Sequence, residues 1–190
     1  MARRNVVSIR DARRAREAAS SGPSSRFTAA ELKAMSIGEV LEVFRTLEAP
    51  DLGEMDGEFV ATLLDQGGPA MNVISSFTTN VPRRWLGKAF EPVDPSEGHG
   101  YNWFQGAGHT VRRYRMKTYL GESAVDAGRS YILEYRPYNS GFMRSMVDEV
   151  RRVAPGLYVG LGRVGFGSWM RTRLYPFMLE GPVGPYSDPG

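Results

Sequence analysis

The sequence contains no cysteine and only two histidines among its 190 residues. The absence of cysteine excludes disulfides, thiolate zinc sites and cysteine nucleophiles, and it fits a reducing compartment. No apolar run has the length of a membrane span, and no apolar segment of the kind found in secretory signals follows the arginine-rich N-terminus. We therefore predict a cytoplasmic protein without a membrane span.

Signature motifs of catalysis and of cofactor binding are also missing. The sequence has no nucleophile elbow, phosphate-binding loop or zinc motif. Residues 160–165 spell GxGxxG, but dinucleotide binding needs a helix directly after this motif, and strand and proline patterns follow it here. His99 and His109 lack the third ligand of an open metal site. We expect no metal and no cofactor, and a single histidine as an axial haem ligand is the alternative.

Positive charge is concentrated at the N-terminus. Residues 1–27 contain seven arginines against Asp11 and Glu17, whereas the whole chain has a formal net charge of +3. A basic arm from Arg3 to Arg16 could bind a nucleic acid or an acidic partner. We favour a solvated arm, because this stretch has no aromatic side chains for base stacking. The predicted organisation is a basic arm (1–27), one barrel domain with a leading helix (28–181) and an irregular tail (182–190).

Residues 130–164 predict three consecutive antiparallel strands. Large side chains from Tyr131 to Tyr135 alternate with others in period two, which places them on one face of a sheet. Turn-forming residues at 137–141 and 154–156 connect the three segments. Strands joined by such short turns are hairpin neighbours, so the sheet is antiparallel.

Further strands follow a helical region. Thr28 and Glu31 form a capping-box pattern, and apolar spacing predicts one helix to Leu47, or two short helices with a break at residues 36–38. The other predicted strands are 58–64, 84–93, 101–105, 111–120 and 169–180, and residues 66–82 are ambiguous between helix and extended chain. About eight short strands indicate an all-β, mainly antiparallel protein. Glycines inside strands, such as Gly160 and Gly162, favour a barrel over a sandwich because they permit sharp coiling.

Six short segments carry a resemblance to a known family, in matching order and spacing apart from a longer stretch between Leu64 and Arg84. The segments are residues 44–45, 56–57, 85–90, 147–153, 159–160 and 177–180. They resemble a bacterial family named for a GXWXG motif, most of whose members have no established function. Glu42, Phe44 and Thr46 stand where the name motif has glycine, tryptophan and glycine. The resemblance implies a lipocalin-like, up-and-down β-barrel.

An eight-stranded barrel is just wide enough to enclose one small ligand. We therefore predict an interior cavity that binds a small hydrophobic or aromatic molecule, with tyrosine hydroxyls to orient it. The predicted ligand-binding residues are Trp85, Trp103, Tyr114, Met116, Tyr131 and Tyr135. Alternation along residues 111–120 places Tyr114 and Met116 on one face of their strand and Arg113 on the other.

An enzyme on the same barrel is the alternative function, with acid–base chemistry of the isomerase or lyase type. Alternation places Asp148 and Arg152 on one face of a strand, and an inward pair could act as acid and base. The predicted catalytic residues are Asp148, Arg152, His109 and Tyr131. We favour an outward, solvated pair, because charged side chains are mostly exposed. The sequence leaves the oligomeric state open.

Overall fold

A closed barrel of eight antiparallel strands forms the body of the protein. The structure, a computed structural model, describes residues 27–80, 82–165 and 173–189. The strands are β1 (Gly57–Leu63), β2 (Arg84–Pro92), β3 (Glu97–Gln105), β4 (Thr110–Glu122), β5 (Arg129–Glu134), β6 (Val147–Ala154), β7 (Leu157–Arg163) and β8 (Tyr175–Gly184). Each strand pairs with the next in the chain, and β8 closes the barrel onto β1. The predicted up-and-down, all-β barrel is confirmed.

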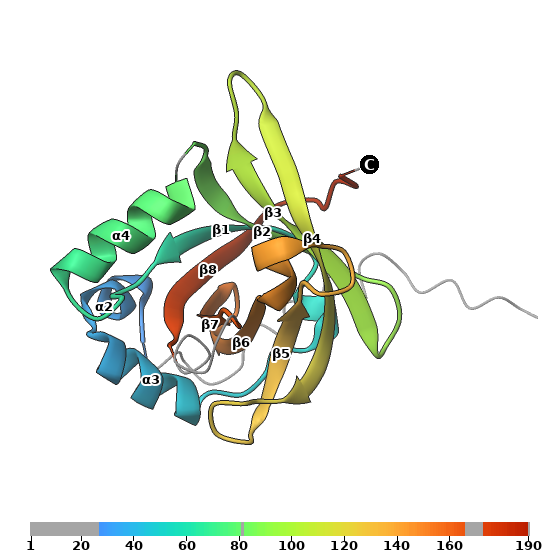
Figure 1. The fold of residues 1–190 in the computed structure, drawn as a ribbon. Helices are drawn as coiled ribbons and strands as arrows, with labels where there is room; N and C mark the ends of the chain where they lie inside the picture. Colours follow the sequence, from blue (N-terminus) through green and yellow to red (C-terminus); the bar gives the residue numbers. More distant parts are fainter. Residues whose placement is uncertain (1–26, 81, 166–172, 190) are drawn as a thin grey trace, which may run out of the picture.

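Short helices accompany the barrel. They are α2 (Ala29–Ala34), α3 (Ile37–Thr46) and α4 (Pro69–Asn80), with 3-10 turns η1 (Leu52–Glu54) and η2 (Gly141–Ser145). Figure 1 shows α2, α3 and α4 gathered on one side of the barrel. Capping boxes begin both leading helices, because Thr28 accepts a hydrogen bond from the amide of Glu31, and Ser36 accepts one from the amide of Glu39. None of the helices in the described ranges combines the length and hydropathy that a bilayer crossing requires.

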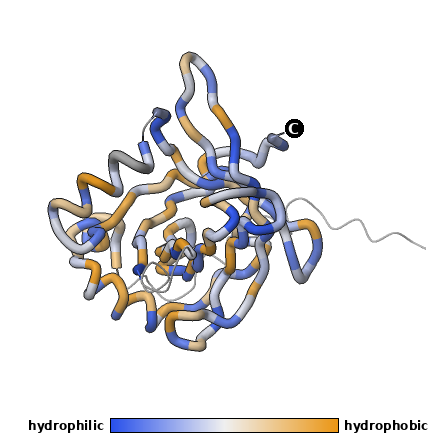
Figure 2. The backbone as a smooth tube through the Cα atoms, in the orientation of Figure 1, coloured by the Kyte–Doolittle hydropathy of each residue, from blue (hydrophilic) through white to orange (hydrophobic). Residues whose placement is uncertain are grey.

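Two apolar cores hold these elements together. Inside the barrel, Phe59, Phe90 and Tyr131 pack with other large side chains. Outside it, Phe44 of α3 packs with Val159 of β7 and neighbouring apolar residues. Hydrophobic and hydrophilic residues alternate along several strands in Figure 2, which is the pattern of a sheet with one apolar face. This inner core leaves part of the barrel interior unfilled, and Phe177 belongs both to the core and to the lining of that space.

A β-bulge in β4 changes which side chains face the barrel interior. Asn102 pairs with Arg113 and Gly100 pairs with Met116, so Tyr114 and its successor lie opposite a single residue of β3. Tyr114 has a φ of 58°, a rare backbone conformation for a bulky residue. Arg113 therefore shares a face with Met116. The predicted placement of Arg113 on the opposite face is wrong, because the bulge interrupts the alternation.

Several segment boundaries differ from the sequence-based predictions, and β3 begins at Glu97, four residues before the predicted start. The ambiguous residues 66–82 contain the helix α4. The predicted strand at 142–153 begins as the 3-10 turn η2, and extended structure starts only at Val147. The predicted tail 182–190 begins inside β8, which continues to Gly184. Most of the predicted arm, and residues 169–172 of the last predicted strand, lie outside the described residues.

Candidate functional site

A cavity of about 520 Å³ lies in the part of the barrel that the inner core does not fill. Strands β1, β2, β3, β4, β6, β7 and β8 contribute to its wall, together with α4 and η2. Apolar side chains dominate the lining and include Leu63, Met71, Trp85, Phe104, Met143 and Phe177. Ile74 of α4 and Phe142 of η2 also line it and are about half exposed, at 52% and 51%, so they mark its opening. The volume is typical of a small-molecule site.

A second depression of about 740 Å³ lies between α2, β1 and α4. Its lining is mostly polar, and Lys33 and Asp65 are its only charged residues besides Arg84 among those described. The depression is open to solvent and contains no buried ion pair. The barrel cavity is therefore the better candidate, because it combines apolar walls with buried polar groups.

The strand register places polar residues on the cavity wall at one level of the barrel. Lys88 of β2 pairs with Asn102 of β3, and Asn102 pairs with Arg113 of β4. Across the barrel, Asp148 of β6 pairs with Gly162 of β7. All five residues line the cavity. The antiparallel register thus brings together groups that are up to 74 residues apart in the sequence.

Lys88, Asn102, Tyr135 and Asp148 form a hydrogen-bonded group that we call the inner cluster. The ammonium Nζ of Lys88 lies 2.7 Å from Oδ2 of Asp148. It also donates to Oδ1 of Asn102 at 3.0 Å and to the hydroxyl of Tyr135 at 2.6 Å. That hydroxyl accepts from Nδ2 of Asn102 at 2.9 Å and donates to Oδ2 of Asp148 at 3.1 Å. All four residues are buried.

Burial perturbs the protonation of the inner cluster. Desolvation lowers the pKa of Lys88, and the charge of Asp148 opposes this shift without cancelling it. Desolvation and the Asp148 charge raise the pKa of Tyr135 well above its ordinary value, so its hydroxyl stays protonated. The Lys88 amine therefore releases its proton more readily than a solvated lysine does. Groups with such shifts occur preferentially at functional sites.

Two buried acceptor atoms in the cavity wall lack a hydrogen-bond partner. They are Oδ1 of Asp148 and Oε1 of Gln66. Gly162 lies against the first of these, and a methyl group built there would come within 3.0 Å of Oδ1. Buried acceptors are normally satisfied, so each unpaired atom is a place where a donor from a ligand or water would be stabilised.

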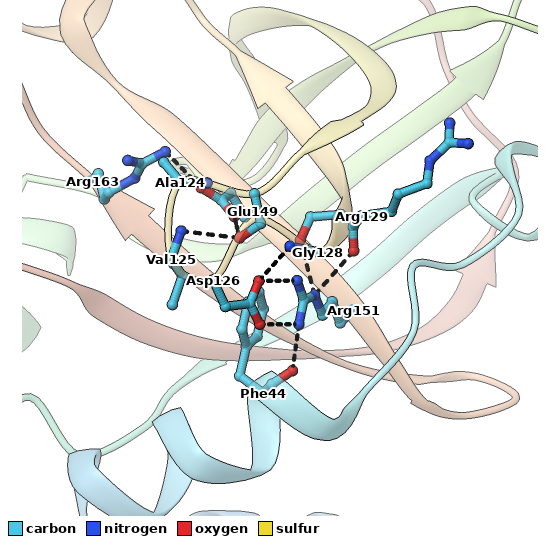
Figure 3. A network of polar contacts seen from close by, with 11 residues as sticks. Phe44, Ala124, Val125, Asp126, Gly128, Arg129, Glu149, Arg151 and Arg163 are labelled. Carbon is cyan, nitrogen blue, oxygen red and sulfur yellow. Dashed lines mark hydrogen bonds and ion pairs between the residues drawn. The ribbon is translucent and has the colours of Figure 1, made fainter.

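A second set of charges lies around the opposite face of β6, and we call Asp126, Glu149, Arg151 and Arg163 the outer cluster. Glu149 and Arg151 are buried, whereas Asp126 and Arg163 are partly exposed. Figure 3 shows the Arg151 guanidinium facing the Asp126 carboxylate, with bonds of 2.6 and 2.7 Å. Arg151 also donates to the carbonyl of Phe44 at 3.0 Å and lies over its ring. These contacts fasten the β4–β5 turn and the end of α3 to the barrel.

Glu149 completes the outer cluster. Its carboxylate accepts hydrogen bonds from the hydroxyl of Ser123, the amide of Ala124 and the guanidinium of Arg163, the last at 2.6 Å. The side-chain oxygens of Glu149 and Asp126 all have partners, so the outer cluster offers no free acceptor. The predicted outward position of Asp148 is wrong, because Asp148 is buried and lines the cavity. The β4–β5 turn and α3 cover the opposite face of β6, on which Glu149 and Arg151 lie.

The predicted ligand-binding residues fall into three places. Trp85 and Tyr114 line the cavity, and Tyr135 belongs to the inner cluster. Met116 and Tyr131 lie in the filled inner core, where burial raises the pKa of Tyr131. The remaining residue, Trp103, donates from Nε1 to the carbonyl of Phe59 at 3.2 Å and is not part of the lining.

The predicted catalytic residues are not brought together. Asp148 lines the cavity and pairs with Lys88. Arg152 instead pairs with Glu54 of η1 at 2.8 Å, so the proposed Asp148–Arg152 pair does not form. Its position near the end of β6 carries it out of reach of the cavity. His109 is exposed in the β3–β4 turn.

Sequence reasoning missed Lys88, Asn102 and Arg113. Lys88 lies two residues before Phe90 in β2, and the alternation of that strand would have placed both on the inner face. No signal in the sequence marks Asn102 or Arg113 as cavity residues, because their positions depend on the β3–β4 register and its bulge.

Comparison with known proteins supports the architecture. No family model and no curated protein matches the sequence. A solved structure described as a protein from Thermomonospora curvata is similar, with a TM-score of 0.54 and 17% sequence identity. The similarity covers 77% of this chain and 87% of that chain. At this level of identity the likeness shows a shared fold.

Proposed function

We propose that the barrel binds a small, largely apolar molecule in its cavity, with the inner cluster as the polar contact. The supporting observation is the Lys88–Asp148 pair on the wall of a mainly apolar cavity of about 520 Å³. Protein interiors are close-packed, and voids of this size weaken a fold unless they are occupied. A buried ion pair contributes little net stability, so its position at the cavity favours a role in recognition.

The cavity can be tested with N-phenyl-1-naphthylamine, a neutral apolar fluorophore. We expect the original protein to enhance the fluorescence in a saturable way. The Met143→Trp variant should bind at least about tenfold more weakly, because the larger side chain fills part of the cavity. The matched control is Val183→Trp, since Val183 is 58% exposed on β8 and does not line the cavity. Absence of binding, or equal affinity in both variants, would contradict the proposal.

A relationship to the GXWXG-motif family is part of the same proposal. Residues 85–90 and 147–153, two of the segments on which the resemblance depends, supply Lys88 and Asp148 of the inner cluster. We propose that related barrels with these segments place a charge pair in the same cavity. A structure of a close family member with no such pair would contradict this relationship.

A second candidate function is proton transfer on a carbonyl compound at Lys88. The lowered pKa of Lys88 favours it, because an amine whose pKa is lowered is deprotonated more readily and can remove and return a proton. The test is deuterium exchange at the α-carbons of 2-decanone, followed by NMR. Exchange above the buffer rate should vanish in Lys88→Met and persist in Arg152→Met, whose altered side chain lies outside the cavity. Equal rates in both variants would exclude Lys88 as the base.

A further inference from the structure

Two arginine side chains line the cavity without a carboxylate beside them. Arg83 lies just before β2, and Arg113 lies on β4 next to the bulge. Neither guanidinium makes an ion pair or a hydrogen bond with any residue in the described ranges. Arg112, by contrast, forms an ion pair with Glu58 at 2.9 Å. Arg83 and Arg113 therefore retain their full capacity to bind an anion.

The charges of the cavity lining are unbalanced. Three cationic side chains, Arg83, Lys88 and Arg113, face a single carboxylate, that of Asp148. Lys88 already neutralises Asp148 at 2.7 Å. The surplus positive charge consequently belongs to the two arginines. A cation beside an apolar cavity is stabilised when an anion occupies the adjacent space.

The bulge in β4 determines where one of these unpaired arginines lies. Arg113 pairs with Asn102, whose side chain contacts Lys88, so Arg113 occupies the same face as the inner cluster. Arg113 is nevertheless exposed, as are its neighbour Tyr114 and the opening residues Ile74 and Phe142. The guanidinium of Arg113 thus lies where the cavity meets solvent. The Lys88–Asp148 ion pair, which has no net charge, is buried.

We propose that the natural ligand is an amphipathic anion, with its apolar chain in the cavity and its anionic group held by Arg83 and Arg113 at the opening. This inference rests on the proposed binding function and narrows its ligand class. Guanidinium groups bind carboxylates and phosphates through paired hydrogen bonds, so either anion satisfies the geometry. An uncharged molecule of equal length would leave both arginines without a partner.

The test compares three ligands with the same ten-carbon chain: decanoate, decyl phosphate and decanol. Their affinities are measured by displacement of N-phenyl-1-naphthylamine and by calorimetry at low salt and at about 0.15 M salt. The test variant is Arg83→Gln/Arg113→Gln. The matched control is Arg129→Gln/Arg136→Gln, which removes the same charge from two exposed arginines outside the cavity lining.

We expect an anionic ligand to bind at least about tenfold more tightly than decanol, the range for hydrogen bonds to charged groups. The Arg83→Gln/Arg113→Gln variant should lose this preference while keeping its affinity for decanol, and the control should keep both. Whichever of decanoate and decyl phosphate binds more tightly identifies the class of anionic group, carboxylate or phosphate. Equal affinity for decanol and both anions, or a preference that survives the double substitution, would overturn this inference and leave cavity binding intact. Failure of all three ligands and of the fluorophore to bind would overturn both.

Discussion

Asp148 and Glu149 are neighbours on β6 and lie on opposite faces of the barrel wall, and both are fully buried. Glu149 accepts hydrogen bonds from three groups through both of its oxygens. Asp148 receives all of its donors at Oδ2, and Oδ1 has none. The outer cluster is saturated and joins structural elements, whereas the inner cluster faces a cavity and keeps an unused acceptor. The contrast indicates a structural role for one cluster and a binding role for the other.

The largest expected effect comes from Arg151→Met in the outer cluster. Removal of the guanidinium leaves the carboxylate of Asp126 and the carbonyl of Phe44 without their donor. Loss of one partner of a buried pair typically costs about 3–5 kcal/mol, and we expect that decrease in the free energy of unfolding by urea denaturation. The control Arg45→Met removes an exposed pair with Glu42 and should cost less than about 1 kcal/mol. Similar losses in both variants would contradict the structural role.

The inner cluster should tolerate removal of both charges better than removal of one. Lys88→Met leaves Asp148 buried and unpaired, and we expect a loss of about 3 kcal/mol or more. The double variant Lys88→Met/Asp148→Leu should recover most of this loss, because no charge remains buried. Arg151→Met/Asp126→Leu should recover less, since Arg151 also binds backbone carbonyls. Equal recovery in the two double variants would remove the distinction between the clusters.

Alternation predicted the hairpins of the barrel because one face of each strand is strongly apolar. Residues 130–164 form β5, β6 and β7 in antiparallel pairs, as expected. The same reasoning failed for Arg113, because the bulge at Tyr114 inserts a residue that no sequence pattern marks. One bulge thus decided which charge faces the cavity.

Burial of charged residues was the second limit of prediction. General statistics place charged side chains at the surface, and this rule gave the wrong environment for Asp148; Lys88 and Glu149 are further exceptions to it. Their burial depends on partners remote in sequence: Asp148 for Lys88, and the turn containing Ser123 for Glu149. Alternation gives the face of a strand, but it does not say what covers that face.

A smaller effect is expected from Gly162→Ala at the boundary of the inner cluster. The added methyl group would lie 3.0 Å from Oδ1 of Asp148, closer than ordinary packing permits. We expect a loss of about 1–3 kcal/mol in the free energy of unfolding, together with weaker fluorophore binding. The control Gly38→Ala lies in α3 with no atom within 4 Å and should stabilise by about 0.5–1 kcal/mol. An unchanged stability in Gly162→Ala would mean that Asp148 moves freely and is not fixed by its partners.

The smallest expected effect is a difference in pH dependence between the two clusters. The Arg151 guanidinium lowers the pKa of Asp126 below its usual value of 3.8, so the stabilisation is complete above pH 3.8 and is lost as pH falls through the lowered value. Burial lowers the pKa of Lys88 below 10.5, so the unfolded chain binds more protons in the window between the two values. The Lys88 contribution to stability therefore rises with pH in that window. The free energy of unfolding of Asp126→Asn should converge with that of the original protein in acid, whereas the difference between the original protein and Lys88→Met should change in the window below pH 10.5. This assignment of the two clusters would be reversed if the difference in free energy of unfolding between the original protein and Lys88→Met changed below pH 4 and stayed constant above neutrality.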